Sequence, residues 1–378
     1  MIRNILWVGF LFRFAVAVWN GFFGPSFGAG GDAAGFQEVA VEFSKNVSVE
    51  EFKITYVYPY VLGFIYYITT DSLFLGSLLS AVAWFASGSI FIKTMRLFSI
   101  SKSNQSKAML IYVLLPSSIL YTSVTLREPY QLLFVNLAIY SALKIYMNRS
   151  FAHWLFLAVA MIGMGVLHGA LLALGLFVMI TTLIMLTLWR GRHFSFKNLL
   201  LVMPLIVPLA LYGLLFFSDI AYNLDEGLGT AISNYQSGAL VDAEGARANY
   251  KVGDFVEFKG VSDLILFVPV SIVQYFLEPF PWHVSSVTDL PVVFENALRA
   301  WLIWQALFAL RHMKDRRERS VLLVFLSFIL LETMWSLGTI NWGTAARHHI
   351  PGTGLLLIAA FAYAKTPVKH SRAIVPSN

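Results

Sequence analysis

Acidic, basic and aromatic residues gather in four short segments of an otherwise apolar chain. The first segment, GAGGDAAGFQEVA, places Asp32 behind a glycine-rich turn and Glu38 further along. A carboxylate held beside a substrate hydroxyl can take its proton as a general base, and this is the functional interpretation of Asp32, with Glu38 as a substrate contact. The alternative is that Asp32 caps a helix that begins here. The glycines do not form a phosphate-binding loop, because no Gly-Lys-Ser/Thr follows them.

The second segment is SVTLREPYQLLF, in which Arg127 and Glu128 precede Pro129. Proline is ordinary in the first turn of a helix, and an Arg–Glu pair can simply neutralise itself. A charged pair that faces the interior of a helix bundle is costly, however, which favours a functional role. On that interpretation Arg127 binds substrate, and Glu128 is a second candidate for the catalytic carboxylate.

The third segment is FLEPFPWHVSSVTDL, which contains Glu278, Trp282, His283 and Asp289, and Glu295 follows it. Its two prolines predict a stiff turn, and one interpretation of the tryptophan is that it simply anchors the chain at a membrane interface. The functional alternative is that Trp282 and His283 form a shelf against a sugar ring or an isoprenoid chain.

The fourth segment, INWGTAARHHIPG, places Arg347, His348 and His349 together beside glycines. Three adjacent potential cations favour a clamp for a phosphate or diphosphate, in which the arginine supplies a two-pronged donor. The alternative is an interfacial anchor. Adjacent histidines lack the i, i+4 spacing by which a helix presents two ligands to one ion, so the sequence predicts no metal site.

The composition indicates a membrane protein. The chain has 378 residues, of which 58% are hydrophobic and 13% charged, and its mean hydropathy is +0.69. The absence of cysteine excludes disulfides, thiolate nucleophiles and cysteine-based metal centres. The net charge of +6 lies in short loops between apolar runs, so it reflects membrane topology and does not predict nucleic-acid binding. Nothing in the sequence predicts a cofactor.

Apolar runs long enough to cross a bilayer recur along the chain, and basic residues gather at alternate ends of them. Because basic loops stay in the cytoplasm, this alternation predicts about ten spans with both termini cytoplasmic. We therefore expect an all-α fold, a polytopic transmembrane helical bundle that forms one integral domain over residues 1–378. All four polar segments then lie on the outer face of the membrane.

Two outer loops, residues 25–71 and 218–293, are expected to carry short interfacial helices. The run from Tyr56 to Thr69 is short and rich in tyrosine, which suits the headgroup region, and the run from Leu264 to Leu277 is expected to be interfacial or re-entrant. Between the two loops, Ala108 to Leu126 is expected to cross the membrane outward.

Single charges inside predicted spans are functional candidates by default, because lone charges are expensive in lipid. Arg13 in the first span and Glu332 in a late span are the two cases, and either can instead snorkel or pair. His168 falls at a predicted outer turn, where it can be an ordinary polar end.

The order of these motifs resembles that of the GT-C superfamily of membrane glycosyltransferases. The resemblance begins with GDAAGFQEVA, YPYVLGFIYYIT and PSSILYTSVTLREPYQLLF. The later motifs, EPFPWHVSS, FENALRAWL and NWGTAARHHIP, are similar to those of bacterial polysaccharide polymerases of the O-antigen and capsule type, which are Wzy-like. The likeness covers most of the chain and is carried by the order of the motifs rather than by any one of them.

The resemblance implies a GT-C-like fold and an enzyme of the bacterial inner (cytoplasmic) membrane whose active site faces the periplasm or exterior. The catalytic role would fall on Asp32, and binding of the phosphates of a polyprenyl carrier would fall on Arg127, Arg347 and His348 or His349. Transfer would be inverting and independent of metal. The chain departs from some members of the superfamily in having no large soluble C-terminal domain, which disfavours protein glycosylation.

The expected reaction joins repeat units donated by a polyprenyl-(di)phosphate-linked glycan. Membrane lipids and proteins for polysaccharide chain length or export are the expected partners, and the acidic loop from Ser218 to Ser262 is a candidate lid. The alternative function is a transporter or flippase of the same lipid-linked saccharide. A transporter would place polar residues at several depths of an inner cavity and would show related halves, and no convincing internal repeat is found.

Overall fold

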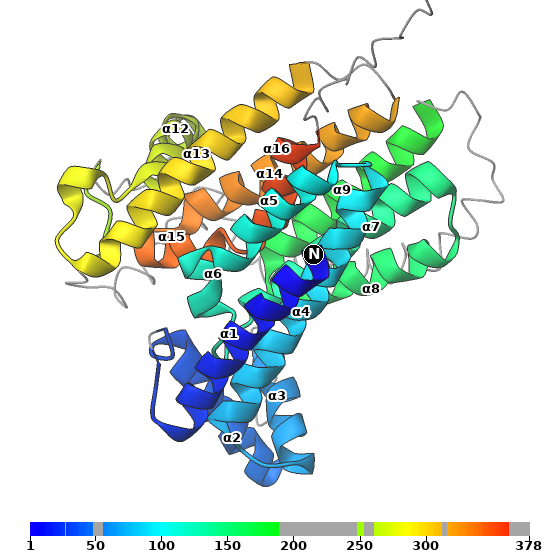
Figure 1. The fold of residues 1–378 in the computed structure, drawn as a ribbon. Coiled ribbons are helices and arrows are strands. Elements are labelled where there is room, and N and C mark those ends of the chain that lie inside the picture. The colour runs from blue at the N-terminus through cyan, green and yellow to red at the C-terminus, as the bar shows by residue number, and fades with distance from the viewer. Residues whose placement is uncertain (27, 48–55, 189–247, 253–260, 312–315, 363–378) are drawn as a thin grey trace, which may run out of the picture.

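The computed structural model describes residues 1–378 apart from 27, 48–55, 189–247, 253–260, 312–315 and 363–378. This part of the chain folds into helices, and the one strand-like pairing within it is a single bridge between Asn249 and Asn341. The predicted all-α fold class is therefore confirmed for the described residues. Most of the candidate lid lies outside them. Long helices run through the middle of the molecule, and a pair of short helices lies at the bottom of the view in Figure 1.

Four helices of the described part are long and apolar enough to cross a membrane, which takes about 20 apolar residues. They are α1 (Ile2–Phe22), α4 (Leu73–Leu97), α9 (Gly169–Leu188, of which Gly169–Leu186 qualifies) and α14 (Arg316–Gly338, of which Ser320–Gly338 qualifies). The predicted membrane character agrees with these helices. The count of about ten spans is not confirmed, because the remaining described helices are shorter or less apolar.

The remaining large helices complete a bundle around these four. They are α7 (Glu128–Asn148), α8 (Ala152–Leu167), α12 (Val261–Leu277), α13 (Leu290–Arg311) and α16 (Thr353–Phe361). Neighbouring helices of the bundle pack in the order α1, α4, α7, α8, α9, α14, and α16 lies between α14 and α13. The helix α12 packs against α14 and α13. One large cluster of buried apolar side chains runs through this bundle.

Outward faces of the bundle keep large apolar side chains exposed. On α13 the exposed residues Phe294, Trp301 and Phe308 recur every seven positions, which places them on one helix face. On α1, Trp7 and Trp19 are more than half exposed. Apolar faces of this extent are expected where acyl chains, rather than water, cover the protein.

The helices α2 (Asp32–Asn46) and α3 (Val57–Ile68) form a closely packed pair at the bottom of Figure 1. Gly63 makes this approach possible, since a Cβ atom there would lie 2.5 Å from the backbone oxygen of Ala40. The predicted short helix between Tyr56 and Thr69 is thus present. Its place at the membrane interface stays a prediction.

The predicted span from Ala108 to Leu126 contains a break in its helix. The chain forms α5 (Lys102–Leu114), breaks at Leu115, and continues as the short helix α6 (Pro116–Tyr121). Proline has no N–H group and disfavours helical geometry in the preceding residue, and Leu115 accordingly has an extended ψ of 119°. The helix therefore bends at this point, and its backbone needs partners from elsewhere.

Two charged side chains supply those partners. The carboxylate of Glu295 on α13 accepts the Ser117 N–H at 2.7 Å and its hydroxyl at 2.6 Å. On the other side of the break, the guanidinium of Arg13 donates to the Val113 carbonyl at 3.4 Å and to the hydroxyl of Thr122 at 2.7 Å. In an unbroken helix Ser117 would donate to Val113. Arg13 and Glu295 thus replace the hydrogen bonds that the break removes.

Arg13, a functional candidate from the sequence, therefore has a structural role. Its side chain is fully buried, and its guanidinium carbon lies 3.5 Å from the centre of the Trp84 ring. It also donates to the Ser118 hydroxyl at 3.0 Å and to the Gly9 carbonyl at 3.1 Å. Its donors are used within α1, α5 and α6, as expected for a charge inside a bundle that pairs rather than reaches for substrate.

The segment expected between Leu264 and Leu277 forms the longer helix α12, which contains Pro269. At 1.5 Å per residue, its 17 residues span about 25 Å, a little less than the hydrocarbon core of a bilayer. Its last turn packs near α14 and α15 (Trp342–His348). Its interfacial or re-entrant position stays a prediction.

The helix ends that were expected to share one side of the membrane meet at one end of the bundle. Arg347 of α15 contacts both Asp32 and Glu128, Arg127 contacts the Leu167 carbonyl at the end of α8, and Trp342 contacts Asp289 before α13. Segments that are far apart in the sequence therefore build a single polar region.

Candidate functional site

Arg347 joins two acidic residues from distant parts of the chain. Its Nη2 atom lies 2.6 Å from Asp32 Oδ2, and its Nε atom lies 3.1 Å from Glu128 Oε1. Asp32 begins α2, Glu128 begins α7 and Arg347 lies in the last turn of α15. The first, second and fourth polar segments of the sequence thus converge on one guanidinium.

Asp32 does not cap its helix. The N-cap residue is Gly31, whose φ of 55° lies in the left-handed region that glycine adopts without strain, and no side chain caps this helix. The Asp32 side chain is 49% exposed and turns to Arg347 instead. The capping alternative is therefore wrong, and one face of this carboxylate remains open to a substrate.

Glu128 is the more enclosed carboxylate, with 2% of its side chain exposed. It lies in the first turn of α7, where the positive end of the helix dipole favours a negative charge. The sequence left open that Arg127 and Glu128 neutralise each other, but Glu128 pairs with Arg347. Its burial and its fixed partner suit an orienting role better than proton transfer to a mobile substrate.

Arg127 keeps unused donors beside this cluster. Its guanidinium makes one long hydrogen bond, 3.4 Å from Nη1 to the Leu167 carbonyl, and lies 5.6 Å from the ring centre of Phe36 on α2. The buried Nε atom has no hydrogen-bond partner, and no carboxylate among the described residues forms an ion pair with Arg127. An arginine with free donors next to Arg347 is a ready partner for an anion.

The electrostatics of the cluster keep Arg347 charged. Burial lowers the pKa of its guanidinium, but the carboxylates of Glu128 and Asp32 raise that pKa by more, so it lies above the ordinary value. Tyr121 of α6 is also nearby, and burial raises the pKa of its hydroxyl, which therefore stays protonated. The cluster of one guanidinium and two carboxylates has a formal charge of −1.

His348 adds no positive charge to this cluster. Its buried ring stacks on Trp335 of α14, with ring centres 4.3 Å apart, and its Nδ1 atom lies 3.0 Å from the Thr339 hydroxyl. Burial and the positive charge of Arg347 hold the pKa of His348 well below its usual range. The ring of His168 packs edge-on against the same tryptophan at 4.3 Å. The expected clamp of Arg347, His348 and His349 is therefore not assembled as three cations. Near Arg347 the structure places Arg127 and the packed rings of His348, Trp335 and His168.

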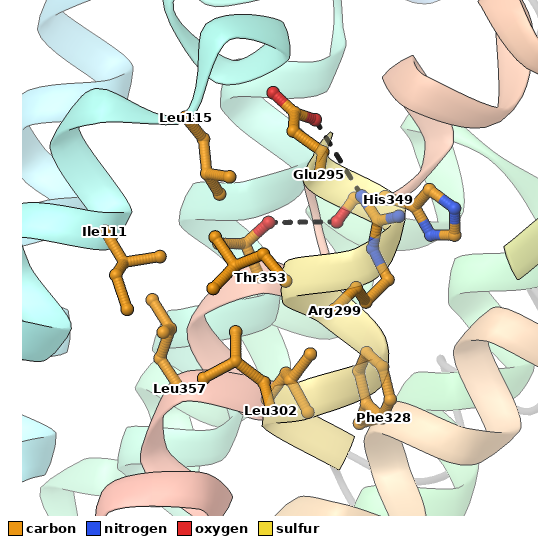
Figure 2. A pocket seen from close by; sticks show the side chains of 11 residues that line it. Ile111, Leu115, Glu295, Arg299, Leu302, Phe328, His349, Thr353 and Leu357 are labelled. Atoms are coloured by element: carbon orange, nitrogen blue, oxygen red, sulfur yellow. Dashed lines mark hydrogen bonds and ion pairs between the residues drawn. The ribbon is translucent and has the colours of Figure 1, made fainter. Parts of the chain in front are cut away.

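His349 points away from Arg347 into the bundle. Its Nδ1 atom is hydrogen-bonded to Glu332 of α14, and its Nε2 atom lies 3.1 Å from the backbone oxygen of Tyr275 on α12. Arg299 and Glu295 of α13 lie nearby, with 3.9 Å between Arg299 Nη2 and Glu295 Oε2. Figure 2 shows Arg299, Glu295 and His349 around one small cavity. These residues form a second, interior cluster.

The third polar segment builds its own turn beside the site. Glu278 is fully buried and accepts the backbone N–H groups of Lys251 and Val252, each at 2.8 Å, while His283 Nδ1 lies 3.5 Å from Glu278 Oε2. Trp282 is 75% exposed and stacks on Phe280, with ring centres 4.9 Å apart. Trp282 and His283 therefore contact their own segment rather than Arg347, and their role as a shelf stays a prediction.

Asp289 connects this turn to α15. It accepts the backbone N–H groups of Ser285 and Ser286 at 3.1 and 3.0 Å, and its other oxygen lies 3.4 Å from Trp342 Nε1. Glu38 lies exposed on α2, about 9 Å beyond Asp32 along the helix axis. The structure does not bring Glu38 to the arginines, and its role as a substrate contact stays a prediction.

Sequence reasoning missed Arg299 and the backbone oxygen of Tyr275 as parts of the interior cluster. Glu295 and Arg299 stand four residues apart in the apolar stretch FENALRAWL, a spacing that places them on one helix face. That spacing was a usable signal. The carbonyl oxygen of Tyr275 left none, because a backbone contact depends on how helices cross rather than on residue type.

The described residues include no group of three His, Cys, Asp or Glu side chains arranged to hold a metal ion. The available chemistry is that of a half-open carboxylate, an enclosed carboxylate and two arginines, which suits proton abstraction beside a bound anion. No protein family, curated protein or solved structure matches the chain.

Proposed function

We propose that the protein is a membrane glycosyltransferase that uses polyprenyl-phosphate-linked or polyprenyl-diphosphate-linked sugars or oligosaccharides in cell-surface polysaccharide biosynthesis. Its proposed reaction is the polymerisation of repeat units. The observation that carries the proposal is the placement of Arg347 between Asp32 and Glu128, with the free donors of Arg127 beside them. A base and an anion clamp in contact are what transfer from a lipid diphosphate requires.

In the proposed mechanism the donor's diphosphate competes with Asp32 for Arg347. Without substrate the guanidinium is neutralised by two carboxylates, and Asp32 is the more exposed of the two. A diphosphate that binds Arg347 and Arg127 would release Asp32 to face the acceptor hydroxyl. Substrate binding itself would then produce the free base.

The chemical step follows from these positions. Asp32 takes the proton of the acceptor hydroxyl, and the oxygen attacks the anomeric carbon of the donor sugar. The bond between that carbon and the diphosphate oxygen breaks, and the leaving diphosphate keeps the electron pair. Arg347 and Arg127 stabilise its charge. The transfer is direct, so the anomeric configuration is inverted.

We also propose how the chain crosses the membrane and on which side the site lies. About ten spans would place both termini in the cytoplasm and the cluster on the periplasmic or external side of the bacterial inner membrane. Convergence of the predicted outer segments on Arg347 supports a common side for them. Exposed apolar faces such as that of α13 would let a polyprenyl chain lie against the bundle while its headgroup reaches the arginines.

The test uses the full chain in lipid nanodiscs, supplied with a polyprenyl-diphosphate-linked oligosaccharide from its own organism. Products are followed by gel and mass spectrometry for the wild type, Asp32→Asn and Glu42→Gln. Glu42 is an exposed carboxylate on the same helix and serves as the matched control. We expect a ladder of longer glycans that is lost in Asp32→Asn and retained in Glu42→Gln. An undiminished ladder in Asp32→Asn would overturn the mechanism.

A second candidate function is transport of the same lipid-linked saccharide. The observation in its favour is the interior cluster, because Glu332, Arg299 and His349 place polar groups deep between helices, as a translocation path would. Movement of a fluorescent lipid-linked saccharide between vesicle leaflets, without any new glycosidic bond, would favour this candidate over the enzyme.

A further inference from the structure

A carboxyl group and an imidazole meet inside the bundle, apart from the candidate site. Glu332 is fully buried on α14, and His349 is 3% exposed where α15 ends. A hydrogen bond joins Glu332 Oε2 to His349 Nδ1. The other ring nitrogen, Nε2, lies 3.1 Å from the backbone oxygen of Tyr275. Both nitrogens of the ring are therefore engaged by oxygen atoms.

These contacts determine how many protons the pair holds. A carbonyl oxygen only accepts hydrogen bonds, so Nε2 of His349 must carry a hydrogen. If the ring is neutral, Nδ1 then has none, and the hydrogen bond to Glu332 requires a protonated carboxyl group. If the ring is charged, Nδ1 donates to a carboxylate. In both cases one proton lies between the two residues, beyond those of a carboxylate and a neutral ring.

We infer that Glu332 and His349 form a proton-binding site that is occupied in this structure and releases its proton as the pH rises. This inference does not depend on the proposed glycosyl transfer. Burial and the charge of Arg299 hold the pKa of the His349 ring well below its usual range. The proton therefore resides on the carboxyl group of Glu332, which donates it to Nδ1.

The surroundings contain one formal positive charge that acts on the pair, namely Arg299 of α13. Other titratable groups near the pair are Glu295 of α13, Tyr275 of α12, His348 of α15, and Tyr250. Arg347 of α15 is also charged, but it is paired with Asp32 and Glu128. The apolar sequences of α9 and α16 contribute none. When the proton leaves, the new carboxylate faces Arg299, which supplies the compensating charge.

A small cavity offers the proton a way out. Its volume of about 20 Å³ leaves room for about one water. Glu295, Arg299, His349 and Thr353 line its polar end, and apolar side chains of α5, α13, α14 and α16 line the rest, as Figure 2 shows in part. A water held there would lie beside His349, where it can exchange protons with the pair.

Two other features of the structure lie next to this proton site. Arg299 also contacts Glu295, the carboxylate that completes the break between α5 and α6. His349 follows Arg347 by two residues, so the proton site and the candidate site share the end of α15.

The experiment uses the full chain in nanodiscs and two spectroscopic signals. Infrared spectra report the carbonyl stretch of a protonated carboxyl group, and nitrogen NMR of labelled histidine reports the protonation of each ring nitrogen, with His349 identified by its loss in His349→Gln. Glu332→Gln removes the carboxyl group while keeping its shape. Glu295→Gln is the matched control, because Glu295 is a buried carboxyl group of the same bundle that contacts Ser117 and Arg299 and no histidine.

At about pH 6 we expect a carboxyl band that is absent from Glu332→Gln and present in Glu295→Gln, and that disappears in a one-proton titration as the pH rises. A His349 ring protonated on both nitrogens would support the same site with the proton on the other partner. The inference is overturned if the band is missing and His349 carries a proton on only one ring nitrogen, or if the signal persists unchanged to about pH 10. The wild-type spectra decide this even if a variant does not fold.

Discussion

The two polar clusters stabilise a buried carboxylate in different ways. Glu128, at the candidate site, forms an ion pair with Arg347. Glu332, in the interior cluster, lies against a histidine whose ring contacts leave a proton between them. Charge is expensive in a low-dielectric interior, so it must be either paired or removed. At the candidate site, the ion pair of Glu128 with Arg347 lies next to the half-exposed carboxylate of Asp32. In the interior cluster, Glu332 and His349 form a neutral, hydrogen-bonded unit.

Exposure distinguishes the charged groups that are available for chemistry from those that are not. At the candidate site, the Asp32 side chain is 49% exposed where it contacts Arg347, so a competing anion can reach the pair. In the interior cluster both partners are enclosed, and the only species small enough to exchange is a proton, carried by water.

Replacing the counter-charge should be the most damaging change. Arg347→Met keeps much of the side-chain volume but leaves Glu128 as an unpaired buried carboxylate, which we expect to cost about 3–5 kcal/mol of unfolding free energy. The measurement is equilibrium unfolding in mixed micelles of increasing denaturing detergent. The double variant Arg347→Met/Glu128→Gln should recover most of the loss. Equal stability of the single and double variants would show that Glu128 is not held by charge pairing.

A steric change should disturb only the interior cluster. A Cβ atom on Gly352 would lie 2.2 Å from Glu332 Oε1, so Gly352→Ala must displace the carboxyl group. We expect a loss of about 1–3 kcal/mol in the same unfolding assay. Gly35→Ala on α2 is the matched control, since nothing lies within 4 Å of its Cβ position, and alanine there should be neutral or slightly stabilising. Equal effects of the two substitutions would contradict the close packing of Glu332.

Acid should weaken the candidate-site end of the bundle through His168. Burial, together with the positive charges of Arg127 and Arg347, lowers the pKa of this ring to about 3. Below about pH 6.5 the unfolded chain gains a proton that the folded protein does not, so the unfolding free energy falls by up to about 1.4 kcal/mol per pH unit. Unfolding measured between about pH 7 and 4.5 should show this slope, and His168→Gln should reduce it by one proton. An unchanged slope would contradict the shift.

The smallest effect is expected from Glu332→Gln. Because the carboxyl group already bears a proton, an uncharged amide of the same shape can donate to His349 Nδ1 in its place. We expect a cost of about 1 kcal/mol or less at neutral pH, a fraction of that for Arg347→Met. Unfolding of the two variants side by side compares the two clusters directly. A loss as large as that of Arg347→Met would mean that Glu332 is charged.

The sequence predicted the polar end of the bundle better than the bundle itself. Asp32, Glu128 and Arg347 were expected on one side because their segments end apolar runs of matching direction, and the structure brings them into contact. That pattern is carried by residue type and order along the chain. What it does not contain is rotation of each helix about its axis, and this is why adjacent His348 and His349 could not be assigned to different surroundings.

The break between α5 and α6 shows a second limit. Pro116 was visible in the sequence, yet its run remained apolar on both sides and was read as one span. Whether such a proline kinks a helix or ends it depends on partners for the freed backbone groups, here Arg13 and Glu295. Those partners lie 100 and 178 residues from the groups they bind, and no local pattern connects them.

That separation also has a consequence for biosynthesis. The ribosome delivers Arg13 before α5, but the Glu295 carboxylate that accepts the Ser117 N–H emerges 178 residues after it. During synthesis, therefore, α5 and α6 can form with the Arg13 contacts in place while the Ser117 N–H still lacks its Glu295 partner. Assembly of this region ends only when α13 arrives, so a nascent chain halted before α13 should remain a substrate for quality control.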